Sequence, residues 1–101
     1  MHSLEKHPLF DCDLEEAALW YGARNPAAAG RLIDETAAAV RTAVADPLRF
    51  SIWHGEIRRV RVKRFPHSVF YEVRGNTVYL TALAHGARDL AALLKERQSH
   101  G

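Results

Sequence analysis

Basic side chains recur at every second position in one segment of the second half of the chain. Arg59, Arg61 and Lys63 alternate with Val60 and Val62, so on an extended strand the charged groups would lie on one face, about 6 to 7 Å apart. A row of cations at that spacing suits successive phosphates or the carboxylates of an acidic partner. A solvated strand face that prevents edge-to-edge pairing of sheets would show the same pattern.

His85 is the best single candidate for acid–base chemistry. A metal-free ribonuclease needs a base, an acid and one or more arginines around the reacting phosphate, and histidine changes charge near pH 6.5. Gly86 follows His85, and Arg88 stands three residues beyond it. Tyr79 is expected on the same face as His85, where it could stack on a base. A structural hydrogen-bonding role is the commoner one for a histidine at a strand end.

Metal and cofactor chemistry is not indicated. Cys12 is the only cysteine, so the chain can form neither an internal disulfide nor a cysteine-based zinc site. Four further histidines show no metal-ligand spacing with carboxylates, and no glycine-rich phosphate loop occurs. These four are His2, His7, His54 and His67. We therefore expect no metal and no cofactor.

The two halves of the chain carry opposite net charge. Residues 1–47 hold four basic and eight acidic groups, net −4, and residues 48–101 hold ten basic and four acidic groups, net +6. Such a dipolar surface predicts a polyanionic partner, either a nucleic acid or an acidic protein, on the C-terminal half.

The length of 101 residues predicts a single domain over residues 1–101. No apolar run approaches the roughly 18 to 20 residues that a membrane span needs, and no targeting segment is visible at the start. We therefore expect a cytoplasmic protein with no membrane partner.

Two helices are expected in the first half of the chain. Asp13 followed by Glu16 matches a capping box, so a helix should start there and end at Gly22. Asn25-Pro26 predicts the start of a second helix, which must stop at Asp46-Pro47. The short connection between the two helices predicts an antiparallel helical hairpin.

Strands are expected from Ile57 onward. The aromatic and β-branched run from Ser68 to Arg74 should join Thr77 to His85 through the two-residue turn Gly75-Asn76. A short edge strand could form at residues 6–10, where Pro8 limits its hydrogen bonding.

The resulting order β-α-α-β-β-β predicts an α+β domain, in which the helical hairpin packs on one face of an antiparallel sheet. A short C-terminal helix is expected from Asp89 to Arg97, and its leucines could fold back on the sheet or wait for a partner.

The expected core joins one face of the sheet to one face of the hairpin. Its strand residues are Val60, Val62, Phe70, Val78, Leu80 and Ala82, and its helix residues are Leu14, Ala18, Leu32, Ile33, Ala37 and Val40. Phe70 and Tyr71 have opposite parity, so only one of them can point fully inward. Trp20 and Trp53 are also expected in the core, Trp53 being the better candidate for a partner contact.

Two segments of the second half carry a family resemblance. The first is I-R-R-V-R-V-K-R-F-P-H-S-V-F-Y-E-V from Ile57 to Val73, and the second is L-A-H-G-A-R-D from Leu83 to Asp89. Together with the order of elements they resemble the RelE/ParE superfamily of type II toxins. The resemblance implies a RelE/ParE-like fold and the toxin role in a toxin–antitoxin pair, of the kind linked to plasmid stabilization. It also implies a cognate antitoxin, with which a heterotetramer could form.

The resemblance leaves two activities open. RelE-like members cut messenger RNA on the ribosome, which here would make His85 the catalytic residue of an endoribonuclease, whereas ParE-like members bind DNA gyrase and hydrolyse nothing. The second segment resembles the ParE-like branch, and the absence of a compact acid–base constellation agrees with that reading. A ParE-like toxin would inhibit growth through target-binding residues, here Arg59, Arg61, Lys63, Arg64 and Arg88. A non-toxic α+β binding domain is the third hypothesis.

Overall fold

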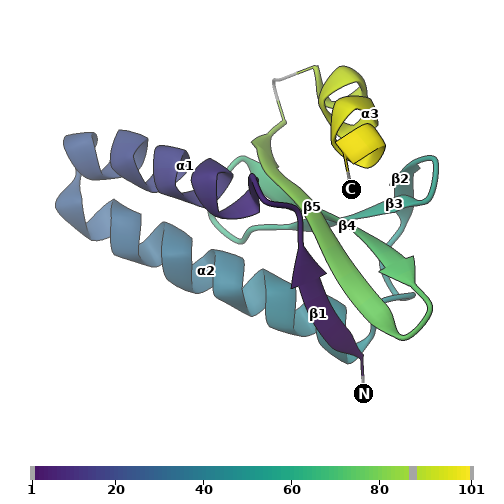
Figure 1. Cartoon of the computed structure of the whole chain (residues 1–101). Helices are drawn as coiled ribbons and strands as arrows, with labels where there is room; N and C mark the ends of the chain where they lie inside the picture. Colours follow the sequence, from purple (N-terminus) through teal and green to yellow (C-terminus); the bar gives the residue numbers. More distant parts are fainter. Residues whose placement is uncertain (1, 87–88, 101) are drawn as a thin grey trace.

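A helical hairpin and a C-terminal helix cover opposite faces of a five-stranded sheet (Figure 1). The computed structural model describes residues 2–86 and 89–100. Its elements are β1 (Ser3–Lys6), α1 (Phe10–Arg24), α2 (Pro26–Ala45), β2 (Ile52–His54), β3 (Ile57–Arg61), β4 (His67–Arg74), β5 (Thr77–His85) and α3 (Leu90–His100). The strands lie in the order β1-β5-β4-β3-β2. The predicted α+β fold is confirmed.

The helix α2 has the predicted ends. The side chain of Asn25 accepts a hydrogen bond from the amide of Ala27 at 3.1 Å, and Pro26 occupies the first helical position, where a missing amide costs nothing. The helix stops at Ala45, directly before Asp46-Pro47. The helical hairpin therefore follows from local sequence signals.

The helix α1 begins before the predicted capping box, so that prediction is wrong. Leu9 precedes the helix and its side chain caps nothing. The amide of Leu9 donates instead to Nδ1 of His7 at 3.0 Å, and the amide of Phe10 donates to the carbonyl of His7 at 3.0 Å. Asp13 consequently lies inside α1, which continues past Gly22 to Arg24.

The buried face of α2 is rotated from the predicted one. Leu32 is fully buried as expected, but Ala37 is exposed and Ile33 is 46% exposed. The buried residues of this helix are Ala28, Leu32, Thr36, Ala39 and Ala43. The prediction failed because alanines occur on several faces of α2, so apolar periodicity cannot fix the rotation of the helix.

Trp20 is also placed differently from the prediction. It is 53% exposed on α1, and the guanidinium of Arg24 lies 3.5 Å from the centre of its ring. The attraction between this cation and the face of the indole ring compensates in part for the contacts that burial would have given Trp20. Trp53 is 37% exposed and packs edge-on against Phe70, with ring centroids 5.6 Å apart.

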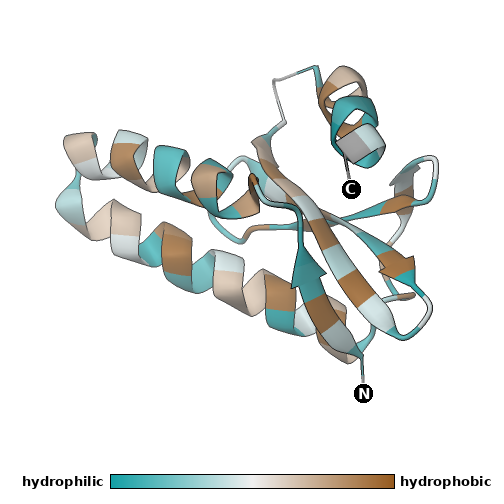
Figure 2. Ribbon diagram, viewed as in Figure 1, coloured by the Kyte–Doolittle hydropathy of each residue, from teal (hydrophilic) through white to brown (hydrophobic). Residues whose placement is uncertain are grey.

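A bulge in β5 reverses the face of the sheet to which the side chains beyond it point. Phe70 pairs with Ala82 and Tyr71 pairs with Leu80, so Thr81 is an extra residue in β5. Polar and apolar bands otherwise alternate along the strand (Figure 2). Val78, Leu80 and Leu83 face the hairpin, whereas Ala82 and Ala84 face α3.

Phe70 and Ala82 thus belong to the core under α3, and their predicted place under the hairpin is wrong. Tyr71 packs on the hairpin side, where its hydroxyl donates to the carbonyl of Pro47 at 2.7 Å. Both neighbouring aromatic residues are fully buried, because both faces of the sheet are covered.

The edge strands also differ in detail from the prediction. β1 spans Ser3–Lys6, before Pro8, and runs parallel to β5. β2 is an additional strand of three residues, and it pairs with β3 through Ile52 and His54. A segment this short has no alternation that could reveal it in the sequence.

The leucines of α3 fold back on the sheet, with Leu90 and Leu94 buried against Phe70 and Ala84. One helical turn further on, Arg97 forms an ion pair with Asp13 of α1 through two contacts of 2.8 Å each. Both side chains are less than a tenth exposed.

The ion pair lies where β1 stops pairing with β5. The last hydrogen bond to the β1 side runs from the amide of His7 to the carbonyl of Leu80, at 2.8 Å. Beyond it, Asp13 accepts from the amide of Leu83 at 3.1 Å, and Arg97 donates to the carbonyl of Thr81 at 3.0 Å. The two side chains thus form the hydrogen bonds at the edge of β5 that β1 leaves unpaired.

In the described residues, no helix is long and apolar enough to cross a membrane.

Removing Arg97 should destabilise the protein far more than breaking an exposed ion pair. We expect Arg97→Ala to lower the free energy of unfolding by about 3 to 5 kcal/mol, because the charge of Asp13 would stay buried without an opposite charge. The matched control is Lys6→Ala, which breaks the exposed pair between Lys6 and Asp11 and should cost at most about 1 kcal/mol. Urea denaturation measures both, and equal losses in the two variants would contradict this role of the pair.

Candidate functional site

Two of the predicted target-binding arginines share one face of β3. Arg59 pairs with Phe70 and Arg61 pairs with Ser68 across the ladder to β4. Directly paired residues lie on the same face of an antiparallel sheet, and Phe70 belongs to the core under α3. Arg59 and Arg61 therefore point to the α3 side of the sheet.

The other predicted basic residues do not continue this row. β3 ends at Arg61, and Lys63 and Arg64 lie exposed in the turn that leads to β4. Arg64 has a left-handed backbone, with φ of 72°. Arg88 lies outside the described residues.

Arg59 and Arg61 line a groove of about 460 Å³ at the β2 edge of the sheet. We call this cavity the edge groove, and its lining residues are Arg49, Phe50, Ser51, Ile52, Trp53, Arg59, Val60 and Arg61. Arg49 lies in the irregular segment between α2 and β2, where no strand periodicity marks it in the sequence.

His85 lies in a second cavity, of about 400 Å³, between α1 and the end of the β4–β5 hairpin. It is paired with His67, and the two imidazole centroids are 5.3 Å apart. Glu16 and Tyr21 of α1 line the same cavity, and the ring of Tyr21 packs edge-on against His67 at 5.8 Å. Burial, together with the nearby charge of His85, lowers the pKa of His67.

The sheet separates His85 from the strand arginines. Arg61 shares its face with Ser68, whereas the next residue, His67, faces the hairpin with its partner His85. Tyr79 was expected on the face of His85, but the bulge at Thr81 moves His85 to the hairpin side, whereas Tyr79 lies on the α3 side, where Arg74 stacks on its ring at 3.8 Å. The predicted acid–base residue and the predicted cations therefore do not meet.

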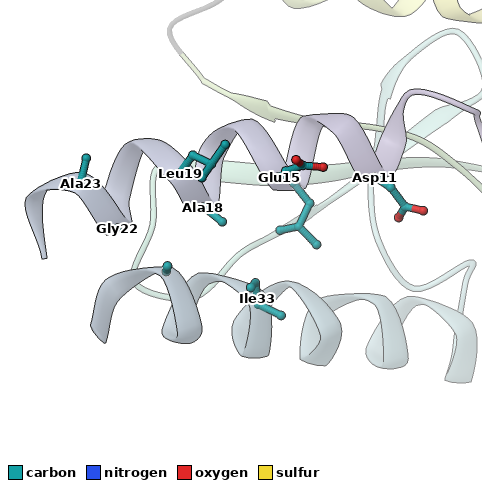
Figure 3. Close-up of a pocket in the computed structure, with 9 residues that line it drawn as sticks. Asp11, Glu15, Ala18, Leu19, Gly22, Ala23 and Ile33 are labelled. Atoms are coloured by element: carbon teal, nitrogen blue, oxygen red, sulfur yellow. The ribbon is translucent and has the colours of Figure 1, made fainter. Parts of the chain in front are cut away.

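A third cavity, of about 600 Å³, opens between the two helices of the hairpin (Figure 3). We call it the hairpin groove. The helices approach closely at Gly22, where an added Cβ would lie 3.3 Å from that of Ala29. Leu19 and Ile33 line the groove and are 67% and 46% exposed. Asp11 and Glu15 supply carboxylates at the same site.

None of these cavities has the donor set of a metal site. Within residues 2–86 and 89–100, no three His, Cys, Asp or Glu side chains gather closely enough to hold a metal ion. The three sites are thus a basic edge groove, a histidine cavity and an apolar hairpin groove.

The sequence of this chain matches a known protein family. Residues 4–90 match the family described as "ParE toxin of type II toxin-antitoxin system, parDE". The chain belongs to the ParE toxin family. Most of α3 follows the residues that the family comparison matches. No curated protein shows a significant match to the chain.

A solved structure supports the fold of this ParE family member. It is described as "Chromosomal ParDE TA system from P. aeruginosa" and aligns with a TM-score of 0.75 over 84% of this chain and 96% of that chain. The sequence identity is 17%, so this likeness concerns the fold alone.

Protonation of His67 should make the protein less stable in mild acid. Its lowered pKa means that the unfolded chain binds a proton more readily than the folded chain. The stability contributed by neutral His67 is therefore complete above the unfolded pKa of about 6.5 and is lost as the pH falls towards the folded pKa. Melting temperatures between about pH 7.5 and 5.5 should fall less in His67→Phe than in the wild type.

The second cause of the lowered pKa can be tested separately. His85→Asn removes the neighbouring charge, so the pH dependence should shrink in this variant too, by less than in His67→Phe. His54→Asn is the control, because His54 contacts the ring of Trp53 and lies outside the histidine cavity. An unchanged pH dependence in His67→Phe would show that other groups cause the loss of stability.

Proposed function

We propose that this ParE family member inhibits growth by binding DNA gyrase, and that a cognate antitoxin neutralises it in the cytoplasm. One observation carries the choice of binding over RNA cleavage: His85 lies on the opposite face of the sheet from Arg59 and Arg61. A ribonuclease must bring a proton-transfer group and cations to one phosphate.

Among the described residues, the lining of the histidine cavity holds none of the lysines or arginines that RNA cleavage needs. It offers His85, His67 and the carboxylate of Glu16, but no lysine or arginine of the described chain lines it. Arg97 contacts Asp13 of the lining but is held in the buried ion pair, and Arg24 stacks on the ring of Trp20 and donates to its carbonyl. Carboxylates would repel a phosphodiester at this site. Half-buried Arg59 and exposed Arg61 on the other side favour a surface that binds a target without chemistry.

The hairpin groove supports the antitoxin part of the proposal. Leu19 and Ile33 are large apolar side chains left exposed beside a cavity, and such patches mark binding sites for partners. A helix with an apolar stripe fits a groove between two helices. Basic residues at one end of that helix would meet Asp11 and Glu15.

Toxicity should survive the loss of His85 and decline with the loss of the arginines. Induced alone in a bacterium, His85→Ala should stop growth nearly as well as the wild type, because no proton transfer is needed. Arg59→Ala combined with Arg61→Ala should weaken inhibition of gyrase supercoiling, and the difference from the wild type should shrink at high salt, where the contribution of the arginines is screened.

Primer extension on ribosome-bound messenger RNA separates the two toxin mechanisms. Codon-phased cuts that disappear in His85→Ala, with supercoiling undisturbed, would make the RelE-like endoribonuclease the correct reading. Normal growth on induction of the wild-type chain would support the non-toxic binding domain instead.

Binding of the antitoxin should depend on the hairpin groove. Leu19→Asp should weaken co-purification with the product of the neighbouring reading frame, because a carboxylate would have to be desolvated in an apolar contact. The matched control is Leu48→Asp: Leu48 is 66% exposed, close to the 67% of Leu19, and lies outside the groove. Equal binding by both variants would place the antitoxin elsewhere, and the mass of the purified complex would test the heterotetramer.

A further inference from the structure

We infer that the histidine cavity binds a guanidinium cation, either free in a small molecule or carried by an arginine side chain of a protein partner. The inference does not depend on gyrase or on the antitoxin. Its chemistry follows from three features of the cavity: a carboxylate that no described residue pairs with, a wall of aromatic and imidazole rings, and a buried polar atom that has no hydrogen-bond partner in the described chain.

The cavity carries negative charge that the described chain does not neutralise. Glu16 lines it, lies exposed on α1 and forms no ion pair with a described residue. Asp13 lines it too, but its charge is compensated by Arg97. His67 adds no compensating charge near neutral pH, because its pKa is lowered. A bound cation would therefore be attracted by Glu16, with no lysine or arginine of the described chain in the lining to repel it.

Rings form much of the wall of the cavity. Trp20 and Tyr21 contribute theirs from α1, with centroids 4.9 Å apart. The imidazoles of His67 and His85 contribute theirs from the sheet. A planar guanidinium can stack on such rings and keep its N–H groups for acceptors in its own plane. Trp20 already binds one guanidinium in this way, that of Arg24, which lies outside the lining.

A buried nitrogen in the wall needs a hydrogen-bond partner. The Nδ1 atom of His67 has none in the described chain, although the residue is only 9% exposed. A buried polar atom left without a partner costs free energy. A ligand rich in donors could bond to it directly or through a water molecule. Guanidinium has five N–H donors in a fixed plane, enough to reach the carboxylate of Glu16 and this nitrogen together.

A guanidinium suits this cavity better than an anion, a metal ion or an ammonium. A phosphate would meet Glu16 as a like charge. A metal ion lacks ligands, because no three His, Cys, Asp or Glu side chains gather closely enough within residues 2–86 and 89–100. An ammonium is more strongly hydrated and cannot stack as a plane. The hairpin groove also has carboxylates, but no aromatic ring of the described chain lines it.

The test is a titration of the isotope-labelled full chain with butylguanidinium. We expect amide shifts at residues 16–21, 67 and 83–85, and affinity that falls with added salt. Butylurea, which is neutral and of nearly the same shape, should bind at least about tenfold more weakly. Butylammonium should also bind more weakly than butylguanidinium.

A second ligand distinguishes the two sources of the cation. It is the tripeptide glycyl-arginyl-glycine with both ends blocked. Tighter binding of the tripeptide than of butylguanidinium would assign the cavity to an arginine of a protein partner. Tighter binding of butylguanidinium would assign it to a free small molecule.

Two neighbouring glutamates of α1 provide matched variants. Glu16→Gln should weaken the binding of butylguanidinium at least about tenfold, because the change removes the charge and keeps the shape. Glu15→Gln should leave the affinity unchanged, because Glu15 lines the hairpin groove instead of the histidine cavity. Both side chains are exposed, so the fold should tolerate either change.

Acid should release the ligand, because protonation of either imidazole adds a like charge. The titratable and charged groups around the two imidazoles are Asp13, Glu16 and Tyr21 of α1 and, behind Asp13, Arg97 of α3. Histidine is the side chain that ordinarily changes charge between about pH 7.5 and 5.5. The affinity should therefore fall over this range, and it should fall less in His85→Phe, which keeps a ring without its charge.

Four results would overturn the inference. Two are equal binding of butylurea and butylguanidinium, and equal affinities in Glu16→Gln and Glu15→Gln. A third is a response confined to residues 11–15 and 29–33, which would place the cation in the hairpin groove. The fourth is a stronger response of the cavity to inorganic phosphate, which would also count against the proposed choice of gyrase over RNA. Failure to inhibit gyrase, with butylguanidinium bound as expected, would leave this inference standing and the proposed function wrong.

Discussion

The buried ion pair between Asp13 and Arg97 links the three layers of this protein. Asp13 comes from the hairpin on one face of the sheet and Arg97 from α3 on the other, and they meet at the edge of β5 that β1 does not reach. Each also satisfies a backbone group of β5, so neither charge is compensated by its partner alone. Since an unpaired buried charge is costly, this ion pair holds α3 to the rest of the domain in addition to its leucines, although most of α3 follows the residues matched by the family.

The strands β3, β4 and β5 could be predicted from the sequence, but the pairing of His85 could not. The turn at Gly75-Asn76 sets Arg74 opposite Thr77, and a regular ladder from there would pair His67 with Ala84. The bulge at Thr81 shifts this pairing by one residue and places His67 opposite His85. Threonine is an ordinary strand residue, so its type gave no signal of the bulge. That single extra residue explains why Ala82 and His85 lie on the opposite faces from those predicted.

The start of a helix could be predicted where local hydrogen bonding sets it, but not where tertiary packing does. Asn25-Pro26 fixed the start of α2 because a cap and a proline act within one turn. Asp13 looked equally like a cap, but its partner Arg97 lies 84 residues away in the sequence. Of the candidate site, the shared face of Arg59 and Arg61 could be predicted from alternation, whereas Arg49 enters the edge groove from an irregular segment.

The core of the sheet also explains why the arginines and His85 remain apart. Bringing Arg61 to the face of His85 would require β3 to slip by one residue against β4, which moves every side chain of the strand to the other face. Val60 and Val62, now buried under the hairpin, would leave that core, and Arg59 and Arg61 would enter it without partners. The slip would thus expose buried apolar area and bury unpaired charges, and both changes would destabilise the fold. The valines that stabilise β3 therefore keep Arg59 and Arg61 on the face of the sheet that His85 does not share.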